Sequence, residues 1–229
     1  MFFPERIKNI KSTDCVLEVG PGGTPHPRSD VFLDLIHTND ENAAFQRGNA
    51  DQLVTNKKTV YYEGGRFPFS DLEFDYVICS HVLEHVEDVE YFLSELFRVA
   101  SKGYIEFPTI YYEYLYNFSV HLNLLKIKNK TLFYLEKAAT PLSVFGTVQN
   151  LFLQSLSKGY TKLVDDLKQV MFEGFEWLEP FPCKKALCIQ ELTFDDILLP
   201  ICETSKCGGR VREYIVQVIN LFFKRKSKR

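Results

Sequence analysis

The sequence lacks any apolar run that approaches the roughly 20 residues needed to cross a bilayer. Its first residues, Met1 to Arg6, also lack the long apolar stretch of a secretory signal peptide. We therefore expect a soluble chain in the cytoplasm. With 229 residues and 45% hydrophobic content, the chain has enough apolar material for one sizeable core, so we expect one domain with elaborations.

The sequence also has no excess of basic residues. Lysine and arginine total 27 against 30 for aspartate and glutamate, which gives a formal net charge of -3. Because no general positive field surrounds the molecule, we do not expect it to bind nucleic acid. Any site for an acidic partner would have to be local.

Cysteines are few and are not spaced as in common zinc motifs. Cys15 and Cys79 lie in apolar runs and are expected in the core. The other four form two pairs, each with four intervening residues: Cys183, Cys188, Cys202 and Cys207. Structural zinc pairs more often have two intervening residues, so reduced, buried or free thiols are favoured over a metal site.

Five short apolar runs have the form of buried strands. They are Cys15–Val19, Val31–Asp34, Thr59–Glu63, Phe74–Ser80 and Gly103–Phe107. Between the last two, an apolar stripe at helical spacing runs from about Val86 to Ala100. Buried strands that alternate with helical pattern predict an α/β fold with a mostly parallel sheet flanked by helices.

Beyond Pro108 the pattern changes to a helical and hairpin elaboration, which we expect on the substrate side. Residues 121–137 are typical of a hairpin that turns at 128–130, and residues 142–172 have helical spacing broken at Gly159. Residues 186–190 are predicted to be a strand that rejoins the sheet. The expected organisation is a core over 1–110, an insertion and sheet completion over 111–200 in the same domain, and a separate end over 201–229.

Two segments of this elaboration leave alternatives open. Tyr111, Tyr112, Tyr114 and Tyr116 could line a pocket for a sugar or a small planar group, although such a stretch is more often packing. The end over 201–229 combines an amphipathic helical pattern with a basic tail. It could make weak contact with an anionic membrane surface, but packing of its apolar stripe on the domain is favoured.

Acidic residues and glycines follow three of the predicted strands. Glu18 ends the first strand and precedes Gly20 and Gly22, Asp34 ends the second, and Glu63 ends the third. At the carboxyl edge of a parallel sheet, such carboxylates can accept hydrogen bonds from an amine or from ribose hydroxyls. Taken singly, each could be a solvated strand end. Together they suit a nucleoside that bears an amino acid.

A dinucleotide site would need a third glycine at position 25, where this chain has Pro25. A helix after the first strand is therefore expected to be short or absent, which disfavours an NAD-dependent oxidoreductase.

The segment Asp75–Val86 contains the run Ser80-His81-Val82-Leu83-Glu84-His85-Val86. It resembles the fourth strand and following turn of class I S-adenosylmethionine-dependent methyltransferases, particularly small bacterial ones. Other segments, at 16–23, 63–64, 67–69 and 103–108, also match, and all of them occur in the same order as in that family. The resemblance therefore covers about the first half of the chain. It implies a Rossmann-like sheet and S-adenosylmethionine as cofactor.

For the methionine part of the cofactor, the resemblance implies that Glu18 contacts the amino group and that the backbone at Gly20 and Gly22 lies against the chain. It also implies that Ser80 and His81 line the floor beneath the sulfonium.

For the nucleoside part, the resemblance implies that Asp34 takes the ribose hydroxyls. Glu63 would accept from the adenine amine, with Gly64 near the ring.

The same run also matches the zinc-protease pattern of two histidines and a glutamate, with His81, Glu84 and His85 at the matching positions. The run begins at the end of a buried strand rather than within a helix, so this interpretation is disfavoured and no metal is expected.

His81 is the candidate base if the acceptor is a hydroxyl, because a neutral imidazole suits that task near pH 7. A turn residue with local hydrogen bonds is the alternative for His81, and a structural role in the turn is favoured for His85.

The sequence therefore predicts a methyltransferase acting on a small-molecule or glycan-type acceptor. The main alternative is a methyltransferase fold that binds the nucleoside without catalysis.

Overall fold

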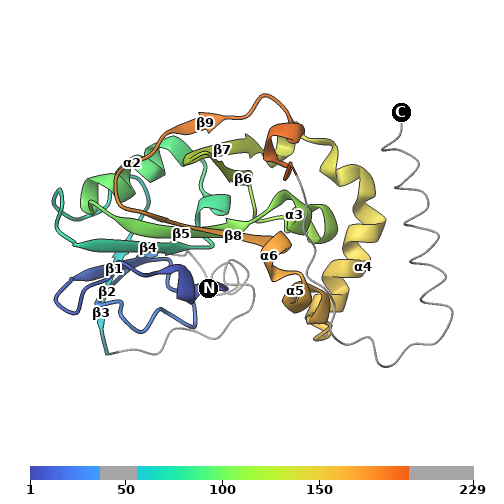
Figure 1. Cartoon of the computed structure of the whole chain (residues 1–229). Coiled ribbons are helices and arrows are strands. Elements are labelled where there is room, and N and C mark those ends of the chain that lie inside the picture. The colour runs from blue at the N-terminus through green and yellow to red at the C-terminus, as the bar shows by residue number, and fades with distance from the viewer. Residues whose placement is uncertain (37–55, 196–229) are drawn as a thin grey trace. The chain divides into compact units, whose positions relative to one another are not determined.

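The structure, a computed structural model, describes residues 1–36 and 56–195, which belong to one compact unit. Its centre is a six-stranded sheet in the order β3-β2-β1-β4-β5-β8 (Figure 1). The strands are β1 (Val16–Val19), β2 (Val31–Leu35), β3 (Lys58–Tyr62), β4 (Tyr76–Ser80), β5 (Gly103–Pro108) and β8 (Phe172–Trp177). The first five are parallel and β8 is antiparallel to β5, which confirms the predicted mostly parallel sheet.

Alternation along the strands separates two apolar layers. Val77 and Cys79 of β4 belong to the main core, whereas Tyr76 and Ile78 belong to a smaller cluster that packs against Met1, Ile7 and Ile10. This is the period of two that directs successive side chains to opposite faces of a sheet.

The helix α2 (Val89–Val99) covers the main-core face. Asp88 caps its start, because the Asp88 carboxylate accepts a hydrogen bond from the Tyr91 backbone amide at 2.9 Å. Phe92 and Leu96 point into the core. The helix confirms the apolar stripe expected between the fourth and fifth strands.

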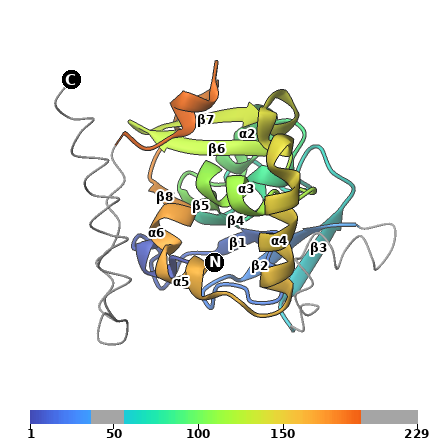
Figure 2. The same ribbon diagram turned by 90° about the vertical axis from the view of Figure 1, so that its right-hand side faces the viewer.

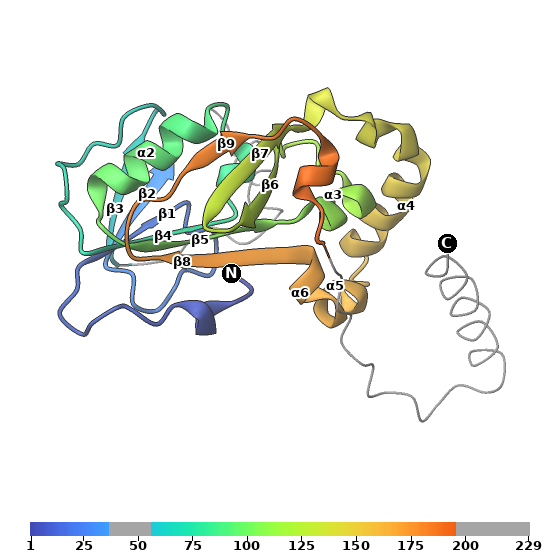
Figure 3. The same ribbon diagram turned by 45° about the horizontal axis from the view of Figure 1, so that its top comes forward.

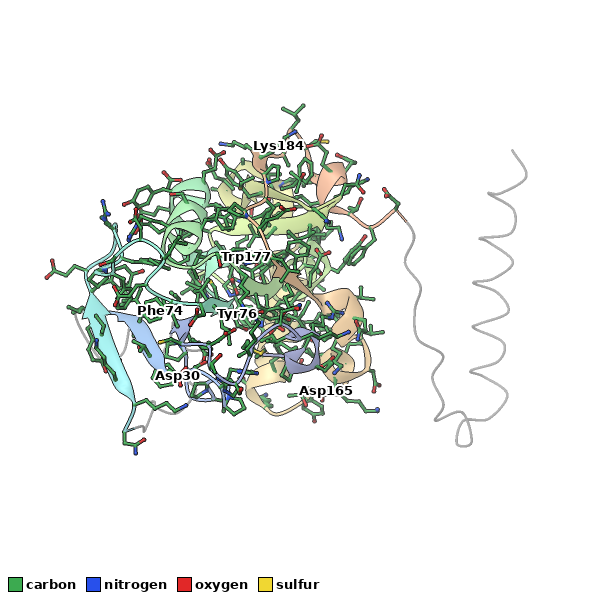
Figure 4. The ribbon with its side chains drawn as sticks, turned by 60° about the vertical axis from the view of Figure 1, so that its left-hand side comes forward. Asp30, Phe74, Tyr76, Asp165, Trp177 and Lys184 are labelled. Carbon is green, nitrogen blue, oxygen red and sulfur yellow. The ribbon has the colours of Figure 1, made fainter. Side chains whose placement is uncertain are left out.

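A small second sheet lies on the same side as α2 (Figures 1 and 2). Its strands are β6 (Asn123–Lys128), β7 (Thr131–Glu136) and β9 (Cys183–Lys185), in the order β6-β7-β9. The hairpin turns at Asn129 and Lys130, both with positive φ, as a two-residue turn of the I′ kind requires. The predicted hairpin is therefore confirmed. In Figure 4, Lys184 of this sheet lies at the top, with Trp177 and Tyr76 of the large sheet below it.

Helices gather at the carboxyl ends of the parallel strands, where β5 leads into α3 (Figure 3). They are α3 (Ile110–Tyr116), α4 (Gly146–Ser157), α5 (Lys162–Asp166) and α6 (Lys168–Met171). Gly159 interrupts the helical region with a φ of 85°, as its position predicted. Short 3-10 turns are η1 (Pro4–Arg6), η2 (Leu83–His85), η3 (Lys137–Ala139), η4 (Pro141–Phe145) and η5 (Ile189–Leu192).

The prediction of a strand at residues 186–190 is wrong. The sheet is completed by β8, whose two glutamates hide its strand character in the sequence. Glu176 accepts hydrogen bonds from the Lys8 and Asn9 amides at 2.9 Å each, and Glu173 pairs with Lys126 at 3.1 Å. The strand can therefore carry charge and still lie at the edge of a buried sheet.

The prediction for Cys15 is wrong, and the predictions for the carboxyl-terminal end cannot be compared with the described residues. Cys15 is exposed, not in the core, because it precedes β1. Cys202, Cys207 and the end over 201–229 lie outside the described residues, so the weak membrane contact stays a prediction. Among the described residues, no helix is long and apolar enough to cross a membrane.

Candidate functional site

One cavity of about 1230 Å³ opens at the carboxyl edge of the large sheet. Every residue predicted to bind the cofactor or act in catalysis lines it: Glu18, Gly20, Gly22, Asp34, Glu63, Gly64, Ser80 and His81. The structure thus brings together residues that lie up to 63 positions apart, because parallel strands end at one edge.

We call the side of the cavity that follows β1, β2 and β3 the glycine end. Its residues are Glu18, Gly20, Gly22, Asp34, Glu63 and Gly64. The opposite side, which follows β4 and β5, is the histidine end. Its residues are Phe2, His81, Glu84, His85, Tyr112, Phe118, His121 and Phe172.

The loop after β1 turns through two glycines with positive φ, at 62° for Gly20 and 57° for Gly22. A Cβ on Gly20 would lie 2.5 Å from Cγ2 of Val82, so this glycine is required by the protein's own packing. A Cβ on Gly22 would meet nothing within 4 Å and would extend into open space. Residues 20–30 contain no helix, as Pro25 predicted.

Glu18 is buried beside this loop. Its Oε2 accepts hydrogen bonds from the His26 amide at 2.9 Å and from the Ser29 hydroxyl at 2.6 Å. Burial disfavours the charged form and raises the pKa of Glu18 to about 7, although both hydrogen bonds oppose the shift. A cation bound here would draw the proton from this carboxyl group.

Asp34 and Glu63 mark the ends of neighbouring strands. Asp34 is half-buried near the end of β2 and lies in register with Tyr61 of β3, while Glu63 is exposed just after β3. Gly64 follows with a φ of 99°. The two carboxylates and the glycine therefore line one side of the cavity, where hydroxyl or amine donors could reach them.

At the histidine end, His81 lies between two carboxylates and has a positive φ of 58°. Its Nε2 is 3.2 Å from Oε1 of Glu106, and its Nδ1 is 3.3 Å from Oε1 of Glu84. Burial opposes a charged ring, yet these two partners outweigh it and raise the pKa of His81 to about 9. Both nitrogens are engaged, so the expected neutral base at pH 7 does not fit this geometry.

Glu106 is a residue that the sequence interpretation missed. Its two oxygens take hydrogen bonds from five donors: the Phe2 and Phe3 amides, the Tyr104 and Ser80 hydroxyls and the His81 ring. Burial opposes ionisation, but these donors hold the pKa of Glu106 at about 2. In the sequence it is only an acid inside the apolar run Gly103–Phe107, and nothing there reveals its partners.

The zinc-protease arrangement is absent from the described turn. Leu83–His85 is a 3-10 turn, η2, and His85 directs its Nδ1 to the Val120 carbonyl at 3.1 Å rather than joining His81. The histidine next to Glu84 and His85 is instead His121, from the loop before β6.

The aromatic stretch in α3 serves mainly as packing. Tyr116 is buried, and Tyr111 stacks on Phe194 with ring centroids 5.2 Å apart. Among the four tyrosines, Tyr112 lines the cavity. Phe118 and Phe172 add further aromatic surface.

Comparison with protein families finds a match over residues 28–105 to the family described as "Methyltransferase domain". The matched stretch holds β2, β3, β4, α2 and the first half of β5. Residues 28–105 of this chain are therefore similar to a methyltransferase domain.

Solved structures of methyltransferases also resemble the chain. A Thermotoga maritima S-adenosylmethionine-dependent methyltransferase is 16% identical, with 48% of this chain and 50% of that chain covered and a TM-score of 0.33. An Aquifex aeolicus one is 19% identical, with 47% and 63% covered and a TM-score of 0.31. A Mesorhizobium loti one is 12% identical, with 72% and 90% covered and a TM-score of 0.39.

The chain thus spans half the length of the Thermotoga maritima protein. A search of curated proteins found no match.

The charge of the cavity suits S-adenosylmethionine, and the loop after β1 leaves space beside its backbone. The described lining contains six carboxylates and no lysine or arginine: Glu18, Asp34, Glu63, Glu84, Glu87 and Asp88. S-adenosylmethionine carries an ammonium and a sulfonium, both of which favour such a surface. The open space at Gly22 leaves the loop backbone accessible to the methionine part.

Proposed function

We propose that this chain transfers a methyl group from S-adenosylmethionine to a small-molecule or glycan-type acceptor without negative charge. One observation supports this proposal above all. The acidic residues and glycines at the strand ends line a single cavity, and aromatic side chains line the same cavity. Acids placed in this way suit an amine, ribose hydroxyls and an exocyclic amine.

At the glycine end, Glu18 would accept from the ammonium of the cofactor, and the backbone at Gly20 and Gly22 would hold the methionine part. Asp34 would take the ribose hydroxyls. Glu63 and Gly64 would hold the adenine. When bound, S-adenosylmethionine supplies an electrophilic methyl group on its sulfonium.

At the histidine end, the residues position the acceptor and favour positive charge. His81 carries one positive charge between the carboxylates of Glu84 and Glu106, so this group is negative as a whole. A negative group on this side of the cavity would favour a cationic ligand. We do not assign removal of the acceptor's proton to His81, because carboxylates occupy both ring nitrogens.

The size and chemistry of the cavity support a small, uncharged or cationic acceptor. Its volume of about 1230 Å³ exceeds the roughly 300–1,000 Å³ typical of single-ligand pockets, so donor and acceptor fit together. Tyr112, Phe118 and Phe172 offer flat apolar surface to a ring. Six lining carboxylates repel phosphate groups, which supports the expectation that nucleic acid is not the acceptor.

Titration calorimetry of the full chain with S-adenosylmethionine, S-adenosylhomocysteine and NAD tests the cofactor. We expect binding of the first two and none of NAD, because the described loop after β1 offers no helix start to a pyrophosphate. NAD binding alone would favour an oxidoreductase.

Methyl transfer itself is tested with radiolabelled donor and a panel of hydroxylated and amine-bearing small molecules. Label should enter a neutral or cationic acceptor. Tight donor binding without transfer to any panel member or cell extract would favour a non-catalytic binding protein.

A further inference from the structure

Glu84 is a buried carboxylate with unsatisfied oxygens. Its side chain is 1% exposed, and neither oxygen makes a hydrogen bond. Its closest charged partner is His81 at 3.3 Å, which also serves Glu106. Because an ionised carboxylate is costly to bury without full pairing, a further positive group beside Glu84 would be stabilising.

Two imidazoles lie next to this carboxylate. Glu84, His85 and His121 each offer one ligand atom, and these atoms lie within 4.8 Å of one another. The two rings are in edge contact, with centroids 4.7 Å apart and planes at 88°. All three residues line the histidine end of the cavity.

Each imidazole is oriented by a partner on its Nδ1. His85 donates to the Val120 carbonyl at 3.1 Å, and His121 donates to the Glu113 carboxylate at 2.5 Å. The Nε2 of each ring is therefore the nitrogen that carries a lone pair. Metal-binding histidines almost always have such a carbonyl or carboxylate partner on the other nitrogen.

The backbone holds the two segments together. The Leu122 amide donates to the Glu84 carbonyl at 2.6 Å, and the Asn123 side chain donates to the Val86 carbonyl at 2.6 Å. Glu113 is in turn held by Lys137 at 3.0 Å. The three side chains are thus preorganised by contacts that do not involve their own ligand atoms.

We propose that Glu84, His85 and His121 form a binding site for a divalent metal ion of the zinc type. Two imidazoles and one carboxylate favour zinc or cobalt over magnesium, which prefers oxygen ligands. Tetrahedral zinc with bonds of about 2.0–2.1 Å sets its ligand atoms roughly 3.4 Å apart, so the side chains would close slightly on binding. Three protein ligands leave a position open toward the cavity for water or an acceptor oxygen.

This inference replaces the sequence expectation of no metal, and it uses His121 where the zinc-protease pattern used His81. It does not depend on methyl transfer, so its test has no activity readout.

The test is titration of the chelator-treated full chain with Co²⁺, followed by visible absorption, and with Zn²⁺ by calorimetry. We expect one Co²⁺ per chain with ligand-field bands and without the charge-transfer band of thiolate ligation. A thiolate band would place the metal on cysteines and overturn the proposal, as would the absence of stoichiometric binding.

Variants identify the ligands. His121→Gln, His85→Gln and Glu84→Gln should each weaken Zn²⁺ binding at least ~10-fold. Glu113→Gln, which removes the negative charge of the partner of His121, should weaken it by about 10-fold. His26→Gln is the matched control, since His26 lies outside the cluster and should leave affinity unchanged. Unchanged affinity in His121→Gln would overturn the proposal. If that variant fails to fold, the Co²⁺ spectrum of the parent chain still decides.

Discussion

The two ends of the cavity are built in different ways. The glycine end consists of strand ends and tight loops from consecutive strands, and its carboxylates lie partly or fully at the surface apart from Glu18. The histidine end draws on residues from Phe2 to Phe172 and rests on buried charges, among them Glu84, Glu106 and Glu113. Changes at the glycine end should therefore alter binding, whereas changes beneath the histidine end should alter stability.

The largest effect is expected at Glu106. Glu106→Gln places an amide against donors that now face a carboxylate, and breaking a buried pair of this kind costs about 3–5 kcal/mol of unfolding free energy. Chemical denaturation measures this loss. Asp166→Asn removes half of an exposed pair with Lys162 and should cost less than about 0.5 kcal/mol. Equal losses in both variants would contradict the difference between buried and surface charge.

Gly20 lies where the two ends of the cavity meet. A Cβ at this position would contact Val82, which is next to His81 in the chain. Gly20→Val combines positive-φ strain of about 1–2 kcal/mol with overpacking of about 1–3 kcal/mol, so we expect a total loss of roughly 2–5 kcal/mol. Gly22→Ala is the matched variant and carries only the strain. It should lose cofactor affinity with the smaller stability loss of about 1–2 kcal/mol that the strain alone causes. Thermal melts and calorimetry separate the two, and parental cofactor affinity in Gly22→Ala would remove this loop from the binding site.

Asp34→Ala isolates the glycine end. Loss of hydrogen bonds from ribose hydroxyls to a carboxylate should weaken S-adenosylmethionine binding ~10- to 100-fold, since each such bond contributes about 1.5–3 kcal/mol. Glu63→Ala should weaken it less, because Glu63 is exposed and water competes for it. Calorimetry with both variants measures the order. Two variants that bind like the parent would place the nucleoside elsewhere.

The smallest effect concerns pH. In the free chain the pKa of Glu18 is about 7, and Lys57 and the terminal amine already limit the rise that burial causes. Below pH 7 the carboxyl group is protonated and must release its proton to bind an ammonium, so cofactor affinity should rise up to ~10-fold from pH 6 to pH 8. Glu18→Gln should bind more weakly and with a flat profile. A flat profile in the parent would separate Glu18 from the ammonium.

The glycine end could be predicted from the sequence, whereas most contacts at the histidine end could not. Val16–Val19 and Tyr76–Ser80 are apolar runs whose period and bounding glycines or polar residues indicate buried strands, and the residues after them share an edge by topology. No local pattern links Glu106 to Phe2, or His121 to Glu84, because long-range packing makes these contacts. The edge strand β8 was missed for a related reason: Glu173 and Glu176 interrupt its apolar period and find their partners in remote segments.

The antiparallel strand β8 also bears on the order in which the chain can assemble during synthesis. Its partner β5 ends at Pro108, and β8 begins only at Phe172, so residues 109–171 are made between the two. The five parallel strands leave the ribosome earlier, with the β5 edge open and Phe97 not yet covered by its contact with Trp177. Such an edge is a template for pairing with other chains. Completion of β8 therefore closes a route to aggregation as well as the sheet, and variants that delay this closure should reduce soluble yield before they reduce the stability of the finished protein.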